Sequence, residues 1–245
     1  MTNGVLVFEG MKVGVLPGDL KIEVDESGSV NSTLILSTAY NVLPIWLRIA
    51  SDQLHRAKNA SEGIASGWTT NDEVNRELLI AELNPSLQVF VACGIALDAL
   101  YDQLRPFAKL SESDIQTWKD NKTKRADQIS EVVRRVYKIK PREAGEFKQN
   151  ITEIIKYRDM AVHPSLELKP ALSRSDVPVL VDWKFSAYRY SNAMKCFHAT
   201  INMLGFLYTQ KSGNQEVDQQ MDAAISALEQ LNVVKRQARP SVGAD

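Results

Sequence analysis

The chain has 245 residues, of which 44% are hydrophobic and 24% are charged, and its formal net charge is −1. This composition is ordinary for a globular protein and argues against a strongly basic nucleic-acid-binding protein. Its two cysteines, Cys93 and Cys196, lie in apolar runs. Buried free thiols are therefore expected rather than a disulfide scaffold or a zinc cluster.

Residues 1–40 predict a small N-terminal antiparallel β-sheet. The stretch LKIEVD (20–25) alternates apolar and polar residues, which is typical of a half-buried strand. VLVFE and MKVGVL are short β-rich runs before it, and after the turn ESGS residues 33–36 return as a further strand. The N-terminus lacks a basic segment followed by a long apolar stretch, so no signal peptide is expected.

Residues 41–84 predict connecting helices, one running from Pro44 to Gly63 and one from a cap at Thr70 or Asn71 to Leu83. The pair Asn84-Pro85 then predicts a new helix, since proline is tolerated in a first helical turn. That helix is apolar on nearly every side and is expected to be central and buried. No uncharged apolar run reaches about 18 residues, so no membrane span is expected.

The remaining pattern is also helical. Helices are expected at 125–137, at 142–162 and, as one long aromatic-rich segment, at 183–208, with a loop and a short strand, VLV, between the last two. Residues 211–245 predict an amphipathic helix and a tail. The fold class is therefore mainly α, an antiparallel helical bundle over residues 85–210 with the small β-sheet before it.

Basic residues crowd the span 119–142, which contains Lys119, Lys122, Lys124, Arg125, Arg134, Arg135, Lys138, Lys140 and Arg142. Most such charge runs are solvated helix faces, and that is the favoured interpretation here. A local nucleic-acid-binding patch is the alternative.

The stretch KYRDMAVHPS (156–165) carries the most informative pattern. Arg158 lies in the middle of an apolar helical stripe formed by Phe147, Ile151, Ile154, Ile155 and Val162. A desolvated guanidinium without a partner costs several kcal/mol, so Arg158 needs a carboxylate, a phosphate or a solvent-filled cleft. Asp98, the one acid within the apolar run VACGIALDALY, is the obvious protein partner. The sequence leaves open whether Arg158 binds Asp98 or an RNA phosphate.

His163 lies about 140° around an ideal helix from Arg158, so spacing alone does not bring the two together. Pro164 disfavours helical geometry at His163, which is therefore expected at the helix end, where its ring can be re-aimed. Asp159, four residues earlier, is placed to orient that ring. Arginine, acid and histidine together suit chemistry on phosphates, in which RNA supplies its own 2′-hydroxyl nucleophile and no metal is needed. No metal or cofactor is expected, since the sequence shows no ligand cluster.

The segment Arg158 to His163, followed by Pro164, resembles the signature of the HEPN superfamily. That signature is an arginine, usually a polar residue directly after it, and a histidine that four to six residues separate from the arginine. The expected order of helices over residues 85–210 is also similar to HEPN domains; the N-terminal sheet and the helices before residue 85 lie outside the resemblance. The resemblance implies a homodimer with one composite, metal-independent endoribonuclease site, in which Arg158 and His163 are catalytic. Many such enzymes are toxins or act in defence against phage. Other members bind nucleotides or are non-catalytic modules, and that is the alternative function.

The expected partners are thus RNA and a second copy of the chain, in the cytoplasm and without a membrane; a regulatory protein that contacts the N-terminal sheet is left open. Two further histidines receive structural interpretations. His198 is expected in the core, because its neighbours are apolar, and His55 on a solvated helix face.

Overall fold

The structure is a computed structural model that describes residues 5–7, 11–163 and 167–234, and it has a mainly α fold with small antiparallel two-stranded sheets. The chain divides into an N-terminal unit, Met1–Val42, and a helical unit, Leu43–Asp245. This confirms the predicted fold class, although the helical unit includes the helices that were expected only to connect the sheet to the bundle.

The N-terminal unit holds two separate ladders instead of the single sheet that was expected. β1 (Met11–Gly14) pairs with β4 (Ser37–Tyr40), and β2 (Leu20–Val24) pairs with β3 (Val30–Leu34). The β2–β3 turn is closed by the Asp25 carboxylate, which accepts hydrogen bonds from the backbone N–H groups of Ser27 and Ser29, both at 2.9 Å. Residues 8 and 9 of the predicted strand VLVFE (5–9) lie outside the described residues.

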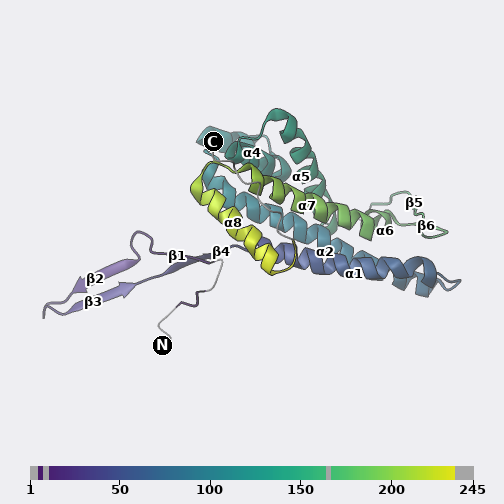
Figure 1. Ribbon diagram of the computed structural model, residues 1–245, viewed down its shortest axis with the longest axis horizontal. Coiled ribbons are helices and arrows are strands. Elements are labelled where there is room, and N and C mark those ends of the chain that lie inside the picture. The colour runs from purple at the N-terminus through teal and green to yellow at the C-terminus, as the bar shows by residue number, and fades with distance from the viewer. Residues whose placement is uncertain (1–4, 8–10, 164–166, 235–245) are drawn as a thin grey trace, which may run out of the picture. The chain divides into compact units, whose positions relative to one another are not determined.

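The helical unit is built around two long helices that lie side by side (Figure 1). Its helices are α1 (Leu43–Gly67), α2 (Asp72–Leu104), α3 (Glu112–Asp120), α4 (Arg125–Tyr137), α5 (Pro141–Val162), α6 (Trp183–Ala187), α7 (Tyr190–Gln210) and α8 (Gln215–Gln230). A short 3₁₀ turn, η1 (Arg105–Phe107), follows α2, and β5 (Leu172–Ser173) pairs with β6 (Leu180–Val181) in the loop before α6. α1, α4, α5 and α7 all pack against α2, which is therefore the centre of the bundle, as predicted.

The expected boundary between residues 84 and 85 falls inside α2, so the prediction of a new helix at Asn84-Pro85 was wrong. Asn71, one of the two residues predicted as the cap, caps the helix, its side chain accepting from the N–H groups of Glu73 and Val74. Pro85 costs the helix one backbone hydrogen bond, but its own ring is buried. Residues on both sides of the proline are buried, and their packing stabilises one continuous helix. A prediction from neighbouring residues alone does not include this packing.

Other helix bounds differ by smaller amounts. The long helix expected at 183–208 is two helices, because Arg189 adopts an extended conformation, with φ −90° and ψ 160°, and begins α7 anew. α3 was not predicted, and α1 runs four residues beyond Gly63 to Gly67. α4 begins and ends at the residues predicted, and α5 begins one residue earlier.

α2 is the one helix among the described residues that is long and apolar enough to cross a membrane, by length and composition alone, over Asp72–Phe107. Half of its most apolar window is buried by the rest of the fold. Both cysteines are buried free thiols, as predicted. The neighbouring Cys93 thiol and burial both raise the pKa of Cys196.

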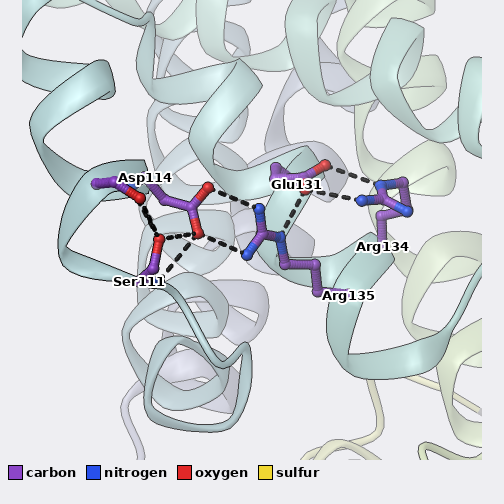
Figure 2. Close-up of polar contacts among 6 residues, drawn as sticks. Ser111, Asp114, Glu131, Arg134 and Arg135 are labelled. Carbon is purple, nitrogen blue, oxygen red and sulfur yellow. Dashed lines mark hydrogen bonds and ion pairs between the residues drawn. The ribbon is translucent and has the colours of Figure 1, made fainter.

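A polar network joins α3 to α4 and accounts for part of the basic span (Figure 2). Asp114 completes a capping box with Ser111 at the start of α3 and binds Arg135 of α4 through both carboxylate oxygens, at 2.9 and 3.1 Å. Glu131 in turn binds Arg134 and Arg135. Arg135 and the Ser111 groups lower the pKa of Asp114 well below its ordinary value of 3.8.

We expect Asp114→Asn to lower the melting temperature at pH 7, because asparagine keeps the shape but removes the charge that Arg135 binds. Because folding lowers the pKa of Asp114, its ionised carboxylate stabilises the fold at pH values above the ordinary pKa of 3.8. This stability is lost as the pH falls below that value. The difference between wild type and variant should therefore shrink in melts at about pH 3. Asp120→Asn in the same helix is the matched control, and an equal loss in both variants would contradict the assignment.

Candidate functional site

Arg158 contacts Asp98 across the α2–α5 interface. Its Nη2 donates to Asp98 Oδ2 at 3.1 Å, and its side chain is 19% exposed. The other oxygen of Asp98, Oδ1, accepts from Arg125 Nε at 2.7 Å, at the first residue of α4. Arg125 also covers the ring of Tyr101, with its guanidinium carbon 3.7 Å from the ring centroid. One carboxylate thus holds two arginines from two different helices.

Gly94 makes this contact possible, because α2 and α5 approach closely at this point. A Cβ atom at position 94 would lie 2.7 Å from Arg158 Cγ and 2.8 Å from its Cβ, which is closer than real Cβ contacts. The stem of Arg158 therefore lies directly on the α2 backbone and extends its guanidinium toward Asp98, one helical turn beyond Gly94. The sequence signal was present, since Gly94 and Asp98 are four residues apart in an apolar helix.

Tyr157 fixes the same part of α5 from the core side. Its ring packs near Phe90 and Tyr188, with centroids 5.3 and 6.1 Å away, and the Tyr188 hydroxyl donates to the Tyr157 carbonyl at 2.9 Å. Tyr188 itself is 1% exposed. This aromatic cluster sets the rotation of α5, and with it the direction in which Arg158 leaves the helix.

The guanidinium of Arg158 is only partly satisfied. Its Nε lies 3.1 Å from Asp159 Oδ1, but the N–H does not point at that oxygen, so Nε is a buried donor without a hydrogen bond. Nη1 has no hydrogen-bond acceptor among the described residues, and the Arg158 side chain as a whole is 19% exposed. Arg158 therefore keeps an open donor while two carboxylates hold its position.

His163 ends α5, as predicted. It is the C-cap residue, with φ −121° and ψ 66°, its N–H donates to the Asp159 carbonyl at 2.8 Å, and the residue is exposed. Within the described part of the chain its ring makes no hydrogen bond or ion pair with Arg158 or Asp159. Pro164, to which the sequence attributes the helix end, lies outside the described residues. One chain thus brings Arg158, Asp98 and Asp159 together, but leaves the imidazole in solvent.

In the basic span, the described arginine side chains form ion pairs, whereas the lysines form none with other described residues. Arg125, Arg134 and Arg135 are neutralised by Asp98, Glu131 and Asp114. Five lysines are exposed and have no ion pair with another described residue: Lys119, Lys122, Lys124, Lys138 and Lys140. Lys124 directly precedes Arg125, so positive charge continues from the Asp98 cluster onto the turn between α3 and α4.

No family model matches this sequence, and no match is found among curated proteins or solved structures.

Of the other two histidines, one lies where the sequence predicted and one does not. His55 is exposed on α1, as predicted. His198 is exposed on α7, not in the core, and lines a pocket of about 450 Å³ between α5 and α7. Its apolar neighbours in the sequence lie on the buried face of the same helix, whereas His198 lies on the other face. Sequence reasoning also missed Arg125 as a partner of Asp98, since nothing local indicates which helix packs at that point.

Proposed function

We propose that this chain is a metal-independent endoribonuclease of the HEPN type that acts as a homodimer in the cytoplasm. The observation that carries the proposal is the state of Arg158. Its guanidinium is held by Asp98 and faces Asp159, yet Nη1 has no acceptor among the described residues, while an exposed histidine follows the end of the same helix, five residues after Arg158. A positioned cation with a free donor beside a free imidazole suits a phosphate ester.

In the proposed reaction the 2′-hydroxyl of RNA loses its proton and attacks the adjacent phosphorus, and the P–O5′ bond breaks, so that a 2′,3′-cyclic phosphate and a protonated 5′-hydroxyl form. His163 exchanges the proton as general acid or base, a contribution of roughly 10²–10⁴-fold. Arg158 stabilises the negative charge that builds on the phosphoryl oxygens, because its position is set before the substrate arrives. Orientation of the imidazole by Asp159 stays a prediction, and it requires a rotamer of Asp159 other than the one that contacts Arg158.

A second copy of the chain completes the site in this proposal. Within the described residues of one chain no contact joins the His163 ring to Arg158, so one chain does not bring both groups together. Two motifs that face each other across a two-fold axis supply both groups from opposite sides. The exposed lysines near Arg125 add sequence-independent attraction for the RNA backbone. A role as a toxin or in phage defence rests on the HEPN resemblance alone.

The second candidate is a non-catalytic nucleotide-binding or protein-interaction module. One specific observation favours it: Asp98 already supplies the carboxylate that a desolvated arginine needs. Under this alternative Arg158 and Arg125 fasten α5 and α4 to α2, and exposure of His163 has no chemical consequence.

We expect purified full-length protein to cleave RNA in the presence of EDTA, and His163→Ala to lower the rate by about 10²-fold or more. His163 is exposed at a helix end, so its removal should leave stability unchanged. His198→Ala, which removes another exposed histidine, is the matched control and should cleave at the wild-type rate. The measurement is single-turnover cleavage of a labelled RNA.

Arg158→Ala is compared with Arg125→Ala, because both variants leave Asp98 with one arginine instead of two. Catalysis by Arg158 predicts a much larger loss of cleavage in Arg158→Ala at equal folded fraction. Equal losses would assign Arg158 a structural role. No cleavage of any RNA by wild type, or cleavage untouched by His163→Ala, would leave the non-catalytic module as the better account.

A further inference from the structure

β2 has one bound edge and one free edge. It pairs with β3 in a two-stranded ladder, and no other described strand lies against it (Figure 1). The ladder continues beyond the strand ends, where the N–H of Ile35 donates to Asp19 O and the N–H of Asp25 donates to Ser29 O. Residues 19 and 25 therefore direct their backbone groups at β3.

The alternation of these hydrogen bonds along β2 identifies the backbone groups that face the free edge. Backbone direction alternates along a strand, so Lys21 and Glu23 also bond to β3, as residues 19 and 25 do. Leu20, Ile22 and Val24 lie between them and direct their N–H and C=O groups outward. The free edge thus offers six backbone groups in a row that no other described strand binds, the usual template for a further strand.

We propose that two copies of the chain associate through this edge, with β2 antiparallel to the partner's β2 about a two-fold axis at Ile22. In this register Ile22 lies opposite the partner's Ile22 and exchanges both backbone hydrogen bonds with it. Leu20 and Val24 do the same with the partner's Val24 and Leu20. Every outward N–H and C=O of the strand then finds a partner.

The side chains select the same register. Lys21 lies opposite the partner's Glu23, and Glu23 opposite the partner's Lys21, in the closely spaced positions between the hydrogen-bonded pairs. A shift of the register by two residues in one direction places Lys21 opposite itself, and a shift in the other places Glu23 opposite itself. Like charges directly opposite are unfavourable, so the neighbouring registers are disfavoured. The free edge of β3, with Asn31 and Thr33 at the equivalent positions, offers no such charge pairing.

The apolar face of the hairpin also favours the pairing. Leu20, Ile22, Val24, Val30 and Leu34 share one face and are each 55–65% exposed. Two-stranded ribbons are marginally stable in water, whereas a sheet of more strands with an apolar face is more stable. Pairing of the two β2 strands gives a four-stranded sheet in which the apolar side chains of both copies lie side by side. The association is isologous, as in most homodimers.

This interface does not depend on the proposed function, since none of its residues belongs to the Arg158 and His163 site. Variants in β2 therefore test the interface, and variants in α5 test the ribonuclease; a wild-type monomer would contradict both proposals, because each requires two copies.

The test is a charge exchange in the full chain, read by light scattering after gel filtration over a range of concentrations. We expect a wild-type dimer, and Lys21→Glu or Glu23→Lys alone should raise its dissociation constant at least tenfold. The double variant Lys21→Glu/Glu23→Lys restores opposite charges across the axis and should recover the dimer. Both residues are exposed, and circular dichroism checks that the helices remain folded. A wild-type monomer, or single variants that dimerise like wild type, would overturn the proposal.

A cysteine cross-link gives a second readout. Ile22→Cys should form a disulfide between copies on mild oxidation, because hydrogen-bonded pairs across an antiparallel ladder have Cα atoms about 5.5 Å apart, within disulfide range. Val13→Cys on β1 is the control and should stay monomeric on a non-reducing gel. Equal cross-linking of both variants, or of neither, would contradict the two-fold axis at Ile22.

Discussion

Glu82→Ala should lower the free energy of unfolding by about 3 kcal/mol, because buried Arg174 loses one of its two carboxylate partners and the Tyr190 N–H loses its acceptor. Glu82 and Arg174 are 3% and 1% exposed at their side chains, and Arg174 Nη2 lies 2.9 Å from Glu82 Oε2. Arg174 also donates from Nε to Asp176 Oδ1 at 3.0 Å and from Nη1 to the Phe185 carbonyl at 2.7 Å. The other Glu82 oxygen accepts from the N–H of Tyr190 at 2.8 Å. One buried pair thus fastens the loop before α6 and the start of α7 to α2.

Chemical denaturation of Glu82→Ala beside Glu77→Ala measures this effect. Glu77 is exposed on the same helix, and its removal should change stability by no more than about 0.5 kcal/mol. The double variant Glu82→Leu/Arg174→Met removes the two buried charges together and leaves only the partly exposed Asp176 without its arginine, so it should cost less than the sum of the single changes. A loss in Glu82→Ala no larger than in Glu77→Ala would show that the pair does not hold the fold.

Gly94→Ala should destabilise the protein by about 1–3 kcal/mol, because the new methyl group overlaps the stem of Arg158 and forces α2 and α5 apart. Gly205→Ala in α7 should have the opposite sign. No described atom lies within 4 Å of a Cβ at position 205, so alanine there gains helix propensity, worth up to about 1 kcal/mol. The same substitution in two helices thus distinguishes close helix packing from propensity.

Both glycine variants also report on the candidate site. Displacement of the Arg158 stem should lengthen its contact with Asp98, so Gly94→Ala is expected to lower RNA cleavage, whereas Gly205→Ala should retain it. Thermal melts give the stability and single-turnover assays at equal folded fraction give the rate. A stabilised Gly94→Ala variant would mean that the two helices separate at little cost.

The sequence by itself determined the features that depend on neighbouring residues. Alternation in LKIEV gave the strand β2, although its five residues are all exposed and the expected half-burial was wrong. The cap expected at Thr70 or Asn71 gave the start of α2, and the pattern of residues 125–137 gave α4 without error. The position of His163 at a helix end was also predictable, since proline restricts the residue before it. Hydrophobic periodicity, capping and proline geometry act within a few residues, and all of them can be read along the chain.

Only the tertiary structure decided which side chains meet. Asp98 was a candidate partner for Arg158, but its sharing with Arg125 follows from the packing of both α4 and α5 on α2. The burial of Arg174 against Glu82, 92 positions apart in the sequence, has no local signal at all. Continuity of α2 through Pro85 likewise depends on the helices packed around it. Ion pairs and helix continuity depend on distances between segments remote in sequence, and these are set by packing of the whole bundle.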